Sequence, residues 1–362
     1  MTLATSAAWQ AAVVAPQRVI DHRVEAVSLS GQSLGTVPVD GVRVSYDGDQ
    51  AVCWRADFAL SDPSLVPMSA ASWLDGRSST RLRVWWRLWT GSVWEEVPLG
   101  TFAVEDPKVD DRGLVSITVP GRDPLEVLRR AGYAAAINVG GLTVSDGLAL
   151  LFATIAPGWP VSIEPTTERL PAGLALWDGD VAEDWTRMAE TAGMQVRTDR
   201  WGIITVARRP DPVVVLADWQ EGPACPVTDL TAQFKTSEIP RQVVVESSAP
   251  DVTQVVGTWG NPDADAFSLT KVLRIQSPTA TTVAAATSLA RLTGERLSDP
   301  MQSVEVEVPQ RGDLDYQDLV LLRRAQSAVS GTFRVAGWGM TLAGRDRPPA
   351  PMRVRMMPRR WA

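Results

Sequence analysis

The stretch Arg81-Leu-Arg-Val-Trp-Trp-Arg-Leu-Trp89 alternates between two kinds of side chain at every second position. A period of two is that of a β-strand, whose successive side chains point to opposite faces. One face carries the apolar residues expected in a core, which are Leu82, Val84, Trp86 and Leu88. The other face carries only arginine and tryptophan. Thr90-Gly91-Ser92 then predicts a turn, and Val93-Trp-Glu-Glu-Val97 predicts a partner strand.

A similar pattern occurs near the other end of the chain. Gly100-Thr-Phe-Ala-Val104 follows the first arginine-bearing strand, and Gly331-Thr-Phe-Arg-Val335 follows a second one, Leu319 to Arg324. Gly121-Arg-Asp123 and Gly344-Arg-Asp346 come next, at spacings of 21 and 13 residues from the two repeated phrases. We interpret this echo as a duplicated β-domain. Chance agreement between short strand sequences is the alternative.

The segment between the two β regions has helical periodicity. Asp123-Pro124 predicts one helix start and Val144 to Ile155 a second helix. A third helix is expected to begin at Asp180, which forms a capping box with Glu183 and precedes an apolar stripe of Val181, Trp185, Met188, Ala189 and Ala192. Met194 to Thr198 and Ile203 to Ala207 predict a closing hairpin that turns through Asp199-Arg-Trp-Gly202.

These patterns predict an α+β, mainly β fold with two β-barrel or sandwich domains and a helix-containing insert between them. The expected divisions are 1–122 for the first β-domain, 123–210 for the insert, and 211–344 for a second β-domain with one helix. Residues 345–362 are locally basic and rich in proline. We expect them to form a docking tail whose contacts come from Arg353, Arg355, Arg359 and Arg360.

Composition excludes several functions. The net charge of −7 argues against specific nucleic-acid binding, which requires a concentrated positive surface. Apolar runs such as Val213 to Ala217 are too short for a membrane span, and no charged and apolar leader opens the chain, so neither membrane insertion nor Sec export is expected. Cys53 and Cys225 lack the spacing of a disulfide framework or zinc site.

Catalytic motifs are also missing. His22 is the one histidine and has no nucleophile motif to serve. Glu95-Glu96 and Asp110-Asp111 place neighbouring carboxylates on opposite strand faces. Asp313, Asp315 and Asp318 lack the glycine and distant glutamate of a calcium loop and suggest a solvated turn, and we attribute the tripeptide Arg311-Gly-Asp313 to chance. We expect no enzyme activity, no cofactor and no metal.

Tryptophan is unusually abundant, with 15 residues. On the arginine and tryptophan face of the strand, guanidinium groups can stack on indole rings. We therefore select Arg83, Trp85, Arg87 and Trp89 as a candidate subunit interface. A second buried layer and a carbohydrate-binding face are the alternatives for the same residues.

In layout, nearly the whole chain resembles the hub proteins of phage tail tips. These include the baseplate hub of contractile tails and the N-terminal hub part of tail-associated proteins in long non-contractile tails. The resemblance covers the N-terminal helix and strand, the phrases Val97 to Val104 and Val119 to Leu128, the capped helix followed by Trp201 to Val206, and Asp313 to Val320. Many relatives have a Pro-Gly-Asp type turn where this chain has Tyr316-Gln-Asp318.

The resemblance implies tube-protein-like β-domains and a homotrimeric ring that joins the sixfold tail tube to threefold tip components. The implied partners are other copies of the chain, a distal tail or tube protein, the tape-measure protein, and tail fibre or spike proteins. The ring would surround the channel for tape measure and DNA, in the tail tip of a virion assembled in the host cytoplasm. The alternatives are a receptor-binding tail module that grips host glycan through exposed tryptophans, and a cell-wall hydrolase.

Overall fold

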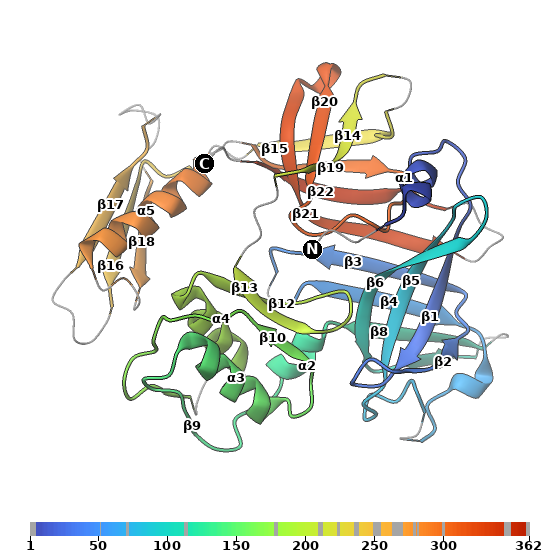
Figure 1. Cartoon of the computed structure of the whole chain (residues 1–362), viewed down its shortest axis with the longest axis horizontal. Coiled ribbons are helices and arrows are strands. Elements are labelled where there is room, and N and C mark those ends of the chain that lie inside the picture. The colour runs from blue at the N-terminus through green and yellow to red at the C-terminus, as the bar shows by residue number, and fades with distance from the viewer. Residues whose placement is uncertain are drawn as a thin grey trace. The chain divides into compact units, whose positions relative to one another are not determined.

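The computed structural model describes most of the chain (Figure 1). The described residues are 5–50, 52–69, 72–111, 115–176, 180–208, 213–222, 225–234, 239–248, 255–262, 271–277, 280, 282–298, 301–343 and 349–359. The chain divides into two compact units, Met1–Asp229 with Val306–Met356 and Leu230–Glu305 with Met357–Ala362. The fold is α+β and mainly β, as the sequence predicts.

The first β-half of the structure comprises the strands up to residue 122. They are β1 (Ile20–Val27), β2 (Ser33–Val37), β3 (Gly41–Asp47), β4 (Trp54–Leu60), β5 (Arg81–Trp89), β6 (Trp94–Val104), β7 (Lys108–Asp110) and β8 (Ser116–Arg122). Helix α1 (Ala7–Val13) precedes them, and the 3-10 helix η1 (Pro63–Leu65) follows β4. All four apolar side chains predicted to share one face of β5 are completely buried, because that face packs into the core.

The second β-half follows later in the chain. Its strands are β14 (Val215–Gln220), β15 (Asp229–Phe234), β19 (Met301–Val308), β20 (Leu319–Arg324), β21 (Val329–Ala343) and β22 (Met352–Pro358), with the 3-10 helix η2 (Ala325–Ser327) after β20. The division between the two compact units falls within β15, within β19 and within β22.

The two β-halves have the same strand order. The first reads β3-β4-β8-β6-β5-β1 and the second reads β15-β19-β22-β21-β20-β14. When each set of six is numbered along the chain, both orders are 2-3-6-5-4-1. The repeated Gly-Thr-Phe phrases lie on β6 and β21, the fifth strand of each set, and both phenylalanines, Phe102 and Phe333, are buried. One difference is that β1 runs antiparallel to β5, whereas β14 runs parallel to β20.

A single long strand joins the halves. The first part of β21 pairs with β20, from Val329 to Arg334, and the later part pairs with β3 from Gly337 to Ala343. All strands of both halves therefore belong to one 14-stranded sheet, whose main path runs from β15 to β2. Among the described strands no sheet closes on itself, so of the two predicted forms, barrel or sandwich, neither β-half is a closed barrel. Instead, β3, the edge strand of the first set of six, pairs with the later part of β21.

The helical insert lies between β8 and β14 and comprises α2 (Pro124–Arg129), β9 (Ile137–Asn138), α3 (Val144–Ile155), β10 (Val161–Ile163), β11 (Ala175–Leu176), α4 (Val181–Thr191), β12 (Met194–Thr198) and β13 (Ile204–Arg208). Its helices start at the predicted positions, and the side chains of Asp123, Thr143 and Asp180 cap them. The predicted stripe on α4 is buried, and Trp185 stacks on Phe152 at 5.7 Å. The insert thus has a hydrophobic core of its own.

The small unit contains β16 (Gln242–Ser247), β17 (Val256–Gly260), β18 (Val272–Ser277) and α5 (Val283–Leu297). The strands form a separate sheet in the order β17-β16-β18. Val243 and Val245 of the central strand pack with Ala286 and Ala290 of α5. The expected second β-domain, 211–344, therefore includes this separate unit and lacks β22. No helix of the described residues has both the length and the apolar character that a bilayer crossing requires.

The docking tail expected over residues 345–362 is wrong for its described central part. Residues 352–358 form β22, which lies between β19 and β21 in the large sheet. Met352, Val354 and Met356 alternate into the core and are completely buried. Arginine and apolar residues alternate here with a period of two, which is typical of a half-buried strand and not of a basic tail.

Asp123 joins the insert to the first β-half. Its carboxylate is fully buried and accepts hydrogen bonds from the backbone N–H of Cys53, Trp54 and Leu125, and from the Thr198 hydroxyl. One side chain therefore caps α2, binds the backbone at the start of β4 and binds the hydroxyl at the end of β12. Burial raises the pKa of Asp123, and the four hydrogen bonds oppose that effect.

Replacing this cap should destabilise the protein far more than replacing an ordinary one. Asp123→Ala leaves three buried backbone donors unsatisfied, and we expect a loss of about 3 kcal/mol or more in unfolding free energy. Asp180→Ala, the matched control at the half-exposed cap of α4, should cost about 1 kcal/mol. Urea unfolding followed by tryptophan fluorescence measures both. Equal losses would contradict the role assigned to Asp123.

Candidate functional site

The candidate interface residues on β5 fall into two environments. Arg83 is buried, and its guanidinium donates to the Thr101 hydroxyl at 3.2 Å and lies 5.0 Å from the ring of Trp201. Trp85 also contacts Trp201, with ring centroids 5.5 Å apart. Trp201 belongs to the turn between β12 and β13. The insert of the same chain therefore covers this end of the face, and Arg83 and Trp85 form a second packed layer there.

The other end of the face is open. Arg87 lies 5.0 Å from the ring of Trp94, which contacts Trp89 across the β5–β6 hairpin with centroids 5.6 Å apart. Trp89 is 37% exposed, and Val93 in the hairpin turn and Val19 beside β1 are 54% and 59% exposed. We call Val19, Trp89, Val93 and Trp94 the hairpin patch. It presents apolar surface to solvent next to a charged network.

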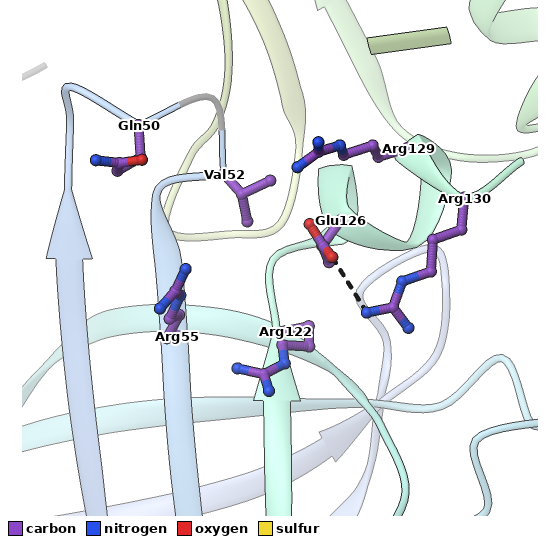
Figure 2. Close-up of a pocket in the computed structure, with 7 residues that line it drawn as sticks. All are labelled: Gln50, Val52, Arg55, Arg122, Glu126, Arg129 and Arg130. Carbon is purple, nitrogen blue, oxygen red and sulfur yellow. Dashed lines mark hydrogen bonds and ion pairs between the residues drawn. The ribbon is translucent and has the colours of Figure 1, made fainter. Parts of the chain in front are cut away.

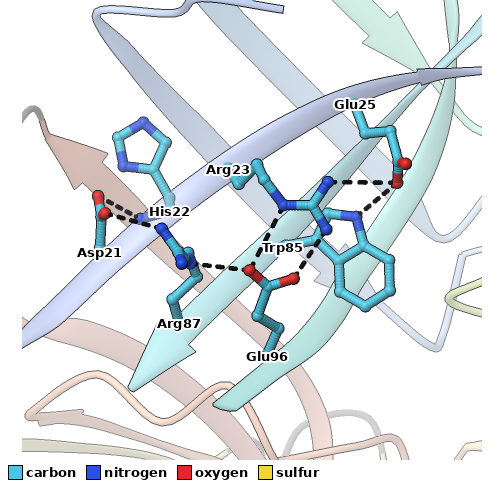
Figure 3. Close-up of polar contacts among 7 residues, drawn as sticks. All are labelled: Asp21, His22, Arg23, Glu25, Trp85, Arg87 and Glu96. Carbon is cyan, nitrogen blue, oxygen red and sulfur yellow. Dashed lines mark hydrogen bonds and ion pairs between the residues drawn. The ribbon is translucent and has the colours of Figure 1, made fainter. Parts of the chain in front are cut away.

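Figure 3 shows that network, which runs across β1, β5 and β6. Arg87 pairs with Asp21 at 3.2 Å and with Glu96 at 2.8 Å. Glu96 also pairs with Arg23 at 2.7 Å, and the Arg23 guanidinium lies 5.1 Å from the ring of Trp85. The Trp85 indole N–H donates to Glu25 at 2.9 Å. The network holds arginine and tryptophan side chains in one arrangement, so they lose less entropy on meeting a partner.

Sequence reasoning missed Arg200, at the tip of the β12–β13 hairpin. Its buried guanidinium donates to the carbonyls of Pro98 at 3.0 Å, Gly312 at 2.6 Å, and Leu314. These acceptors belong to the first β-half and to the segment before β20. The turn sequence Asp-Arg-Trp-Gly was visible, but its acceptors lie about a hundred positions away on either side. Arg200 therefore ties the insert to both β-halves.

Two sequence motifs near Arg200 are internal. Arg311 and Asp313 form a buried fork of two hydrogen bonds, 3.0 and 2.7 Å long, so the tripeptide is no exposed adhesion motif. Asp318 is also buried and accepts from the backbone N–H of Asp315 at 2.7 Å, which makes the expectation of a solvated turn wrong. Within the described residues, no group of acidic, histidine and cysteine side chains is arranged to hold a metal ion.

The arginines expected in the docking tail pair within the sheet. Arg353 pairs with Glu307 of β19 at 3.0 Å, and Arg355 pairs with Asp49 at 2.9 Å and with Asp47. Arg359 directly follows β22, and Arg360 lies outside the described residues. These contacts attach β22 to neighbouring segments of the same chain.

Several of the abundant tryptophans lie in the core. Trp9, Trp54, Trp86, Trp185 and Trp219 are at most 2% exposed. Trp54 packs between Tyr46 and Trp338, with centroid distances of 4.5 and 5.6 Å, and so links the two β-halves. Among the described tryptophans, Trp89 and Trp201 are the most exposed, at 37% and 43%.

The fold is that of phage tail proteins. It is similar to a tail protein from Neisseria meningitidis MC58, with 15% identity, a TM-score of 0.67, and coverage of 93% of this chain and 96% of that one. It is also similar to the 43 kDa tail protein of prophage MuSo2 from Shewanella oneidensis, with 12% identity, a TM-score of 0.63, and coverage of 94% and 98%.

A component of a secretion system has a similar fold. It is the E. coli c3393 protein of the type VI secretion system, which is itself structurally similar to T4 bacteriophage tail proteins gp27 and gp5. Its identity to this chain is 13% and the TM-score is 0.51, with coverage of 95% of this chain and 75% of that one. No family model and no curated protein matches the sequence. The predicted resemblance to tail hub proteins is confirmed for the fold.

Asp318 provides a pH test of the buried region around Arg200. Burial and, to a smaller extent, the nearby Asp315 carboxylate raise its pKa to about 7, against the opposing effects of the Asp315 backbone N–H and of Arg200. Because the folded-state pKa lies above the unfolded one, the protonated form favours folding; that contribution is complete below about pH 4 and is lost as the pH rises through 7. Asp318→Asn should therefore melt at a higher temperature than wild type at pH 8, with the difference shrinking toward pH 4. A difference independent of pH would contradict this assignment.

Proposed function

We propose that the chain is a structural hub protein of a phage tail tip or baseplate and has no enzymatic role. The observation that carries the proposal is the repeated strand order of the two β-halves within one sheet. Three chains with two equivalent halves each present six similar β surfaces, which fits a sixfold tube on one side and threefold components on the other. Chain-long similarity to tail proteins supports the same function.

In this proposal the protein forms a homotrimeric ring around the channel used by the tape-measure protein and then by DNA. Its neighbours are a distal tail or tube protein and tail fibre or spike proteins, and it resides at the tail tip of the virion. The net charge of −7 per chain supports a channel role, because like charge discourages DNA from adhering. The hairpin patch is the proposed contact with the neighbouring subunit.

The proposed trimeric ring has a defined mass that can be measured. Light scattering after size exclusion should give a particle near three times 39.2 kDa, and negative-stain images of the same fraction should show a central hole. Trimer formation should depend on protein concentration, because an obligate interface acts by mass action. A compact monomer at all concentrations that binds cell-wall sugar would overturn the hub and favour the receptor-binding alternative.

The hairpin patch can be tested separately. The double variant Trp89→Ser with Trp94→Ser should weaken trimer association by at least about 2 kcal/mol, roughly thirtyfold, because buried tryptophans dominate interface energies. Leu292→Ser, on the exposed face of α5, removes an apolar side chain that is more exposed than Trp89 and lies outside the patch, and it should leave the trimer intact. Sedimentation velocity measures both. A trimer unaffected by the double variant would place the interface elsewhere.

A further inference from the structure

A pocket of about 310 Å³ lies in the first unit, where the loop between β3 and β4, the start of β4, the end of β8 and α2 meet (Figure 2). Its lining is dominated by positive charge, with Arg55, Arg122, Arg129 and Arg130 against a single carboxylate, Glu126, and with Gln50 and Val52 completing it. Neither the proposed ring nor the channel makes use of this pocket.

Two of these arginines are placed against each other. Arg55 on β4 and Arg122 on β8 are direct cross-strand partners in the antiparallel register. Like charges in that position destabilise a sheet. Figure 2 shows Arg122 extending toward Arg55 at the pocket. The pair therefore creates a positively charged site, and a bound anion would reduce the repulsion between the two arginines.

The surrounding carboxylates leave part of this charge uncompensated. Glu105 pairs with Arg122 at 2.7 Å and with Arg130, and Glu126 pairs with Arg130 at 3.1 Å. Arg129 lies 3.8 Å from Asp180, a loose pair with both groups about half exposed.

Arg55 has no such compensation. Within the described part of the chain, it forms no ion pair and no side-chain hydrogen bond. Asp57, the next residue on the same face of β4, lies opposite Arg43 in the register instead. Four guanidinium groups against three carboxylates leave one positive charge at the pocket of an otherwise acidic protein.

The size and composition of the pocket favour carboxylate side chains over nucleic acid. Guanidinium groups bind carboxylate and phosphate equally well in geometry. However, a hollow of this volume takes side chains and not a duplex, and a net charge of −7 opposes DNA at long range. Val52 adds an apolar contact for methylene groups, and Gln50 adds an amide donor.

We propose that this pocket binds an acidic peptide segment of a partner protein, with Arg55 and Arg129 as the principal carboxylate ligands. Arg122 and Arg130 keep their internal pairs with Glu105 and contribute positive potential. The segment would insert one or two aspartate or glutamate side chains. This site is separate from the hairpin patch and does not require the ring.

The test uses the purified full-length chain and fluorescein-labelled hexaglutamate, followed by fluorescence anisotropy at low and high salt, with hexaglutamine as the uncharged probe. Wild type should bind hexaglutamate in a salt-sensitive manner and ignore hexaglutamine. Arg55→Gln and Arg129→Gln should each weaken binding about tenfold, since each removes a charge-assisted contact. Arg323→Gln, at an exposed position of β20, makes the same charge change outside the pocket and should bind like wild type.

Stability provides a second measurement. Arg55→Gln should melt no lower than wild type, because it removes a like-charged cross-strand neighbour and no ion pair. Reduced peptide binding with unchanged melting therefore separates ligand contact from misfolding. Equal losses in Arg55→Gln and Arg323→Gln would overturn the site in favour of overall charge, as would no binding by wild type. A 20-base-pair duplex that competes in an Arg55-dependent manner would replace the peptide with nucleic acid.

Discussion

The buried guanidinium of Arg200 is the contact on which the first unit depends. It donates to backbone carbonyls from two segments more than two hundred positions apart, near Pro98 and Gly312. Backbone carbonyls in a dry interior need donors, and a guanidinium is the side chain that can serve several at once. Its own hairpin is held by Asp123 through Thr198 and by Thr101, which donates to the Arg200 carbonyl. Insert and sheet therefore share one polar core.

That polar core explains why the arginine and tryptophan face of β5 is divided. The hairpin tip that carries Arg200 also carries Trp201, which covers Arg83 and Trp85. The strand extends beyond the reach of the tip, so Arg87 and Trp89 stay at the surface with an ordered charge network beside them. One strand thus contributes both to the internal packing of the chain and to the surface that we propose for a neighbouring subunit.

The repeated strand order gives the proposed hub its geometry. Each half of the large sheet contains six strands in the same order, and β21 is long enough to pair with β20 and then with β3. Insertions differ between the halves, since the first is followed by the helical insert while the second receives the small unit between β15 and β19. Similar β surfaces can therefore coexist with different attachments.

Local patterns in the sequence determined the elements. The alternation over Arg81 to Trp89, the caps at Asp123 and Asp180, and the repeated Gly-Thr-Phe phrases depend on residues close together in the chain, and each predicted element is present. Only the tertiary structure decided which surfaces are free. Arg83 and Arg87 are equivalent in sequence, yet a hairpin more than a hundred residues away covers one and leaves the other. The same holds for β22 and for the cross-strand pair of Arg55 and Arg122, because long-range register follows from packing of the whole sheet and not from any local pattern.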